Sequence, residues 1–191
     1  MFDSTQQAMQ FAFHISGVPI VKTSGIYSMV PPNKKKPTDK HGNEVAIVRT
    51  HMRCQSPELV GLTIHERHAQ AAMIIACVER AVDTTGMAYI RAHYGRELFG
   101  GEHARIVADI LVRAVVGALG TGMHSRRGLQ KLILNYFGKD ITLANIANDL
   151  NCTLYIVTKK RGVVYDALDA VGTRADIDAE LALYNAGLIG D

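Results

Sequence analysis

The sequence predicts a mainly α-helical protein, a multi-helix domain with a C-terminal helix-turn-helix and an N-terminal β-hairpin. Apolar residues make up 48% of the chain but aromatic residues only 6%, with no Trp, which is typical of helical proteins. From residue 56 onward, apolar side chains recur at helical spacing between capping residues and glycines. Before residue 53, runs of β-branched residues lie between Gly and Pro instead. We therefore expect two parts, residues 1–55 and residues 56–191.

The first part begins with a predicted helix over residues 3–15, opened by Ser4 and ended by Gly17 and Pro19. Strand-forming residues then fill 20–30 and 44–52 on either side of a polar loop. This pattern predicts a β-hairpin whose tip carries Lys34, Lys35 and Lys36. The tip is either a solubilising loop or a finger that contacts phosphates, and the charge run alone does not separate these readings.

The second part reads as a run of short helices, each opened by a capping residue. Ser56-Pro57-Glu58 marks a helix start, and the capping box of Thr63 and Glu66 opens the main helix, which runs to Asp83. Two further helices are expected after it, one capped by Thr84 or Thr85 and closed by Gly95, and one over Glu102–Leu119. A third is expected from Ser125 to Phe137, ended by Gly138. A last helix is expected to be capped by Thr173 and to carry Ile177, Leu181 and Leu183 on its apolar face. The glycines of residues 117–122 are a candidate hinge.

Residues 141–165 carry the pattern of a helix-turn-helix. Thr142 caps a first helix with Ile146, Ala147 and Leu150 on one face, and Asn151-Cys152 makes the break. The second helix begins near Thr153, and we expect Ile156, Val157, Val163, Val164 and Gly162 on its buried side. A break of three or four residues and a small residue at Ala147 favour a helix-turn-helix over an ordinary helical hairpin.

The outer face of the second helix is where such a motif contacts DNA. Tyr155 and Thr158 are expected to read bases, whereas Lys159 and Arg161 are expected to contact the backbone. The full set of candidate DNA-binding residues is Thr153, Tyr155, Thr158, Lys159, Lys160, Arg161, Arg126, Arg127, Lys34, Lys35 and Lys36. Apolar Leu154 lies on the same face, and Asn replaces the usual glycine of the turn.

The formal net charge of +3 conceals a strong asymmetry along the chain. Residues 22–53 and 121–165 are each rich in Lys and Arg, whereas the last 26 residues are acidic, with six carboxylates against Arg174. Two basic blocks indicate two surfaces that could face a polyanion. The acidic end is either a solvated face or a contact for a basic protein surface.

The residues that could bind metals or carry out catalysis form weaker patterns. His51, Cys54, His65 and His68 have a spacing that zinc could use, but we favour surface histidines and expect no metal or other cofactor. Glu79, Asp83 and Asp109 could in principle hold Mg²⁺, although their spacing places them on no shared strand or loop. No catalytic set emerges, so we expect a protein that is not an enzyme.

The cysteine and hydropathy patterns indicate the cellular compartment in which the protein is expected. Three widely spaced cysteines do not make a disulfide framework and fit a reducing cytosol. No secretory leader and no apolar run long enough to span a bilayer is present. We therefore expect a cytoplasmic protein without a membrane partner.

The C-terminal third resembles the fourth region of bacterial sigma factors, in which a helix, I-A-x-x-L, a turn and a Lys- and Arg-rich helix follow one another. With the upstream segment H-A-Q-A-A-M-I-I-A-C-V-E-R, the short helix ending H-Y-G and the final L-x-x-x-G-L-I, residues 60–189 resemble the antitermination Q proteins of lambdoid bacteriophages, of the helical class. The likeness rests on order and spacing, and the hairpin at residues 20–52 has no counterpart in that class.

The resemblance implies a phage-type transcription regulator in the cytoplasm of a bacterial host. It would bind double-stranded DNA near a late promoter and act on RNA polymerase as an antitermination factor, and it could form a homo-oligomer. One alternative is a simple repressor or activator. Another is a metal-dependent nuclease that uses the helix-turn-helix only for targeting, which cleavage of plasmid DNA in Mg²⁺ or Mn²⁺ would favour.

A first prediction concerns the basic tip. Neutralising Lys34, Lys35 and Lys36 together should weaken binding to all DNA sequences alike, because flexible lysines contact phosphates and phosphates carry no sequence information. The slope of log affinity against log salt should fall by about one unit for each phosphate that is no longer neutralised. Salt titrations of wild type and the triple variant on two unrelated duplexes measure both effects, and a changed sequence preference would contradict the prediction.

Overall fold

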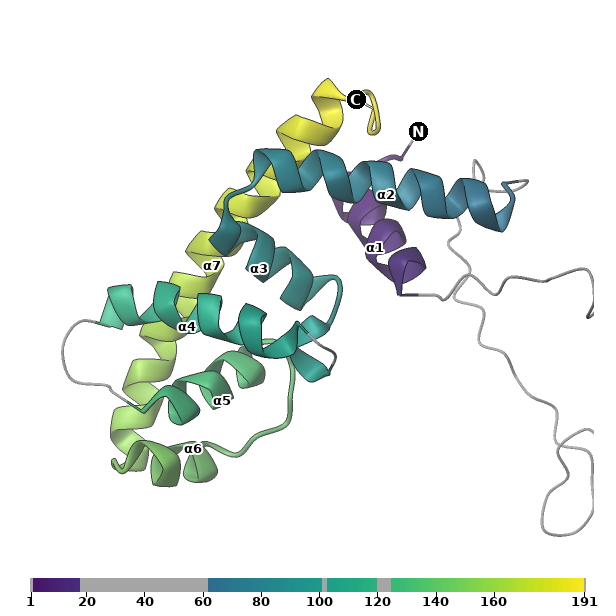
Figure 1. Ribbon diagram of the computed structural model, residues 1–191. Coiled ribbons are helices and arrows are strands. Elements are labelled where there is room, and N and C mark those ends of the chain that lie inside the picture. Colours follow the sequence, from purple (N-terminus) through teal and green to yellow (C-terminus); the bar gives the residue numbers. More distant parts are fainter. Residues whose placement is uncertain (1, 18–61, 101–102, 120–124, 191) are drawn as a thin grey trace, which may run out of the picture.

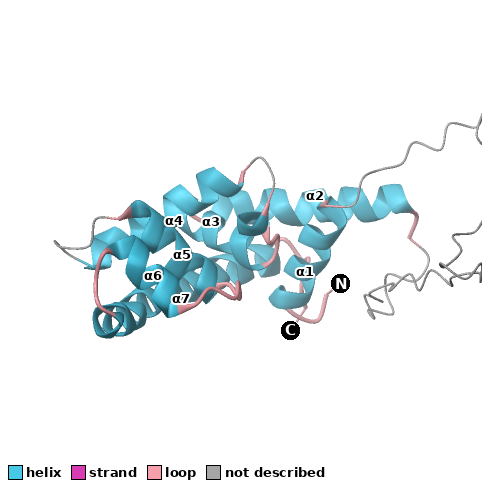
Figure 2. Cartoon of the chain, turned by 90° about the horizontal axis from the view of Figure 1, so that it is seen from below, coloured by secondary structure: helices cyan, strands magenta, loops and turns pink. Residues whose placement is uncertain are grey.

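The computed structural model describes residues 2–17, 62–100, 103–119 and 125–190, and in these ranges the chain is almost entirely helical (Figures 1 and 2). Its elements are α1 (Thr5–Ser16), α2 (Ile64–Ala81), α3 (Thr84–His93), the short 3₁₀ helix η3 (Glu97–Phe99), α4 (Ala104–Leu119), α5 (Arg126–Tyr136), α6 (Leu143–Leu150) and α7 (Leu154–Asn185). An isolated parallel bridge joins Phe2 to Ile189. The prediction of a mainly helical protein is confirmed.

Helix α7 is the long element against which the others pack. It has 32 residues, and its buried residues form one stripe: Val157, Val164, Leu168, Gly172, Ala175, Ala179 and Leu183. These positions are three, four or seven residues apart, so they follow one face of the helix. Helices α4, α5 and α6 contact its N-terminal half, and α1 and α2 contact its C-terminal half (Figure 1).

The buried side chains form two hydrophobic cores along α7. The first contains residues of α1 and α2 with Ala175, Ala179 and Leu183 of α7. The second contains residues of α4, α5 and α6 with Val157, Val164 and Leu168. Helix α3 lies between them, since Met87 and Ile90 enter the first core while Ala88, Tyr89 and Ala92 enter the second. Both α3 and α7 therefore join the two cores.

At four of the predicted helix starts, the residue expected to cap the helix does so in the structure. The hydroxyl groups of Ser4, Thr63, Ser125 and Thr142 each accept a hydrogen bond from the backbone N–H group three residues later, as expected. The predicted capping box is also present, because the Glu66 carboxylate accepts from the Thr63 backbone N–H at 2.6 Å.

Two predicted helix starts are wrong. Helix α3 is capped one residue early, because the Asp83 carboxylate accepts from the Gly86 N–H at 2.6 Å, and Thr84 is the first helical residue. Thr173 caps no helix, because it lies inside α7. The buried stripe of α7 continues from Leu168 through Gly172 to Ala175 without a break, so packing holds this part of the chain in the same helix.

Several expectations concern residues outside the described ranges. The β-hairpin at 20–52, the helix start at Ser56-Pro57-Glu58 and residues 120–122 of the candidate hinge are among them. Gly117, at the start of that candidate hinge, is part of α4. Helix α1, which we grouped with the hairpin, packs in the first core against α2 and α7.

Glycines allow α3 and α7 to cross closely. A Cβ atom at Gly172 would lie 2.4 Å from Cζ of Tyr89, and one at Gly86 would lie 2.9 Å from Cβ of Ala175. Both distances are too short for a carbon–carbon contact, which is about 3.5–4.0 Å at its optimum. The Tyr89 ring therefore packs directly on the backbone of α7.

Hydrogen bonds between side chains support this crossing. The Tyr136 hydroxyl donates to the Asp169 carboxylate at 2.5 Å, and its oxygen lies 3.1 Å from that of Tyr89. Since Tyr136 has a single hydroxyl proton, Tyr89 is the donor of the second bond. Burial raises the pKa of Tyr89 and of Tyr136 above the usual range, and both phenols stay neutral near pH 7. The bonds thus link α3, α5 and α7 in one network.

A second prediction compares two glycines of α7. Gly172→Ala should lower the free energy of unfolding by about 1–3 kcal/mol, because the new methyl group must displace the packed Tyr89 ring. Gly162→Ala should raise it by about 0.5–1 kcal/mol, because a Cβ there meets nothing within 4 Å and alanine favours the helix. Urea denaturation of both variants measures the two changes. Equal effects would show that the crossing does not depend on Gly172.

Candidate nucleic-acid interface

Helices α6 and α7 are joined by a turn of three residues, Asn151, Cys152 and Thr153. Asn151 has φ 49° and ψ 48°, the left-handed conformation that Asn tolerates better than most residues. The Asn151 N–H donates to the Asn148 carbonyl at 3.2 Å, and the Cys152 N–H donates to the Ala147 carbonyl at 3.1 Å. The turn therefore satisfies two carbonyl groups at the end of α6 while the chain changes direction.

Buried side chains fix α6 between α5 and α7. Ile146 and Ala147 are buried, as predicted, and Leu150 packs against the second core. Gly128 of α5 makes room for Leu150, because a Cβ at Gly128 would lie 2.3 Å from Cγ of Leu150. Helices α5, α6 and the start of α7 therefore form one packed unit around Ile146.

The prediction of which α7 residues are buried is only partly correct. Val157 and Val164 are fully buried, but the side chains of Ile156 and Val163 are 41% and 40% exposed, and Gly162 is exposed. Val157 and Val164 are two turns apart on the same face, and Ile156 and Val163 each lie about 100° away from that face. The second core therefore covers the side of α7 that carries Val157 and Val164 and leaves Ile156 and Val163 partly exposed.

The outer face of the first two turns of α7 is solvent-exposed. It presents Thr153, Leu154, Tyr155, Thr158 and Lys159, and the Tyr155 side chain is 76% exposed. Lys160 and Arg161 are partly buried, and the Arg161 guanidinium lies 5.7 Å from the centre of the Tyr165 ring. The Thr158 hydroxyl donates to the Leu154 carbonyl at 3.0 Å, so it is turned toward its own helix.

Cations of α5 pair with carboxylates of the neighbouring helices α4 and α6. The Arg127 Nε lies 3.6 Å from the Asp149 carboxylate near the end of α6, and Lys131 pairs with the same carboxylate. Arg126 pairs with Asp109 of α4, where its Nε lies 3.1 Å from Oδ1. Hydrogen bonds from Lys131 and Arg126 lower the pKa of Asp149 and Asp109 below the usual range.

Neither ion pair removes its arginine from solvent. The Arg126 and Arg127 side chains stay 65% and 78% exposed. The structure thus places Arg127 and Lys131 beside the turn that starts α7, and Lys131 is an addition to the residues predicted from the sequence. Lys34, Lys35 and Lys36 lie outside the described residues.

The candidate Mg²⁺ carboxylates have structural contacts of their own. Glu79 forms a 2.7 Å ion pair with Arg91, Asp83 caps α3 and Asp109 pairs with Arg126. In the described ranges no group of three or more His, Cys, Asp or Glu side chains gathers as metal ligands would. His65 is exposed at the start of α2 and His68 is partly buried, whereas His51 and Cys54 lie outside the described residues.

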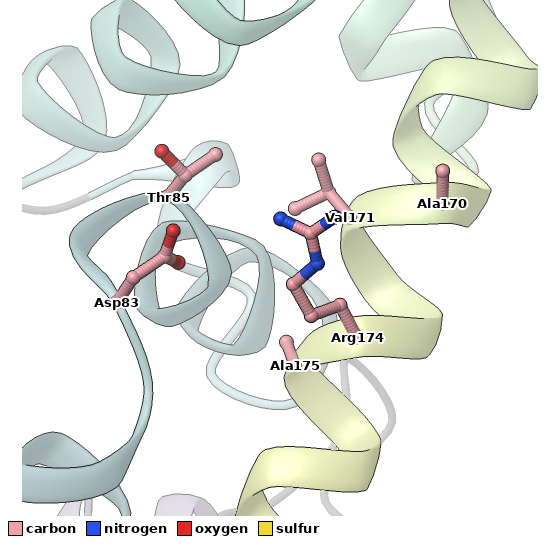
Figure 3. A pocket seen from close by; sticks show the side chains of 6 residues that line it. All are labelled: Asp83, Thr85, Ala170, Val171, Arg174 and Ala175. Carbon is pink, nitrogen blue, oxygen red and sulfur yellow. The ribbon is translucent and has the colours of Figure 1, made fainter.

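A small open pocket of about 210 Å³ lies between α3 and α7, away from the α6–α7 turn (Figure 3). Its lining residues are Asp83, Thr85, Ala170, Val171, Arg174 and Ala175. The Asp83 carboxylate already caps α3, and half of the lining side chains are apolar, so the pocket offers few free polar groups. Among the described helices, none is both long and apolar enough to cross a bilayer.

Comparison of this chain with protein-family models, with curated proteins and with solved structures gave no match.

A third prediction concerns that turn. Asn151→Ala should lower the free energy of unfolding by about 1–2 kcal/mol, because a residue with an ordinary Cβ is strained at a positive φ. Asn151→Gly is the matched control and should be close to neutral or stabilising, because glycine adopts this conformation without strain. Urea denaturation of the pair measures the difference. Equal stabilities would show that the left-handed turn is not required.

Proposed function

We propose that the chain binds double-stranded DNA through a helix-turn-helix formed by α6 and the start of α7, and that it regulates transcription. The observation that carries the proposal is the three-residue turn, which leaves the outer face of the first two turns of α7 exposed. Arg127 and Lys131 of α5 pair with Asp149, two residues before this turn. A helix presented in this way fits the major groove, which is about 12 Å wide. In such motifs the second helix enters the groove and its first residues meet the bases.

The distribution of charge supports the same orientation. Residues 125–165 contain seven Lys and Arg residues and two acidic residues, Asp140 and Asp149. Beyond this range α7 carries Asp166, Asp169, Asp176, Asp178 and Glu180 against one arginine, Arg174. A polyanion is therefore attracted to the N-terminal end of α7 and repelled along the remainder.

The exposed side chains divide into those suited to contact bases and those suited to contact phosphates. Tyr155 is the most exposed side chain of the first turn and can reach base edges with its ring and hydroxyl. Thr158 is close enough to act with it, although its hydroxyl proton is engaged by Leu154. Lys159, Lys160 and Arg161, with Arg126 and Arg127, suit phosphate contacts.

Antitermination is the more specific form of this proposal, and the sequence resemblance to lambdoid antitermination Q proteins supports it. The protein would then act on RNA polymerase as well as on DNA. Readthrough of a terminator by purified RNA polymerase in the presence of the protein tests this step. A simple repressor or activator would bind DNA without causing readthrough. The nuclease alternative and the homo-oligomer remain predictions.

A fourth prediction tests the DNA-reading face. The probe is a duplex enriched from a random-sequence pool by the wild-type protein, compared with a scrambled duplex at fixed salt. Tyr155→Ala and Thr158→Ala should each weaken binding to the enriched duplex by about 1–3 kcal/mol, because each substitution removes a side chain that meets a base. Binding to the scrambled duplex should change little. Lys159→Ala should weaken both alike, because a phosphate contact carries no sequence information.

Tyr184→Ala is the matched control, since Tyr184 is a 50% exposed tyrosine near the other end of α7. It should bind both duplexes as the wild type does. Circular dichroism checks that every variant is folded. If Tyr155→Ala and Thr158→Ala both bind the enriched duplex as tightly as wild type while folded, α7 is not the reading helix.

A further inference from the structure

The first turn of α7 exposes apolar side chains where the helix would enter the groove. The side chains of Leu154, Tyr155 and Ile156 are 53%, 76% and 41% exposed. They are consecutive residues at the start of a helix whose buried stripe begins only at Val157. We name these three residues the apolar tip. Apolar side chains gathered on a surface can mark an interaction site.

The structure also reduces the hydrogen-bonding capacity of this tip. The Thr158 hydroxyl donates to the Leu154 carbonyl at 3.0 Å, so its proton is not free for a base. The remaining branch of the Thr158 side chain is a methyl group. Between Leu154 and Thr158, the free side-chain donor is therefore the Tyr155 hydroxyl. At the tip itself, apolar contacts with bases can therefore accompany the hydrogen bonds that the Tyr155 hydroxyl and the Thr158 oxygen can still make.

Charge decides which kind of partner fits the tip. Arg127 and Lys131 both pair with Asp149, two residues before the turn that precedes the tip, and the Arg127 side chain stays 78% exposed. Lys159 follows the tip on the same helix and is exposed. An apolar centre with a cationic border complements a polyanion that exposes apolar groups between its charges. In duplex DNA the major groove has this character where the C5-methyl group of thymine projects into it.

We propose that the apolar tip reads thymine methyl groups in the major groove and that Leu154 is a specificity-determining residue. This inference rests on the proposed DNA-binding function. Apolar contact with the thymine methyl is an established form of base recognition and needs no hydrogen-bond donor. The preferred DNA is then a duplex with thymines at fixed positions, read by shape and apolar contact.

The experiment replaces thymine by deoxyuridine, which removes the methyl group and keeps every base-pairing and groove hydrogen-bonding group. The probe is the duplex enriched from a random pool by wild-type protein, synthesised with dT and with dU. Affinity should fall about fourfold for each contacted methyl group, the effect expected from one buried CH₂-sized group. Binding to a scrambled duplex should be the same with dT and dU, because phosphate contacts dominate there.

Leu154→Ala tests the named residue, and its exposure makes it a safe substitution for the fold. In this variant the loss on changing dT to dU should be at least about fourfold smaller than in wild type, because the methyl group no longer has its partner. Leu181→Ala is the matched control, since Leu181 is a 59% exposed leucine far along the same helix. It should keep the full wild-type loss.

The outcomes separate the two proposals. A protein that enriches no duplex and binds no DNA would overturn the proposed function and the thymine inference together. A protein that enriches a duplex but binds its dT and dU forms equally would overturn the thymine inference alone, and would assign the apolar tip to a protein partner. A wild-type loss that Leu154→Ala leaves unchanged would overturn the role of Leu154.

Discussion

The buried stripe of α7 is the constraint on which the rest of the structure depends. A single helix of 32 residues, about 48 Å long, supplies one face to both hydrophobic cores. Because both cores bury apolar area against the same helix, the continuous α7 fixes the position of one core relative to the other. The stripe also fixes the rotation of α7 about its axis. That rotation decides which side chains of its first two turns face solvent beside α6.

Close approach at one crossing secures this arrangement. Gly172 lets the Tyr89 ring pack on the backbone of α7, and the Tyr89 hydroxyl continues into the bonds of Tyr136 and Asp169. Burial raises the pKa of both phenols, which keeps them neutral donors at physiological pH. The contact orients α5 relative to α7, so the Arg126 and Arg127 end of α5 is held in place beside the α6–α7 turn.

The proposed function follows from how charge and apolar surface divide along the same helix. Cations collect around the N-terminal end of α7, and carboxylates follow further along the helix, where Asp166, Asp169 and Glu180 are exposed and Asp176 and Asp178 are partly buried. The proposed DNA-reading surface is thus confined to the first two turns. Within it, the exposed Leu154 and Tyr155 and the inward hydroxyl of Thr158 favour recognition by apolar contact, while the surrounding Lys and Arg would supply most of the affinity.

The sequence by itself determined the features that depend on neighbouring residues. Helix starts at Ser4, Thr63, Ser125 and Thr142 were predictable because a side-chain oxygen and the backbone N–H three residues later form the cap. The helical class and the turn at Asn151 were predictable for the same local reason. The exposed positions Tyr155, Thr158 and Lys159 also followed, once Val157 was taken as buried.

Only the tertiary structure decided the rest. Thr173 has the sequence of a cap, but packing of Gly172 and Ala175 keeps it inside α7. Ile156 and Val163 are as apolar as their buried neighbours Val157 and Val164, and the rotation of α7 against the second core determines which pair is buried. The pairing of Arg127 and Lys131 with Asp149 joins residues from two helices. Such contacts depend on how helices distant in sequence pack, and that information is not local to any stretch of the chain.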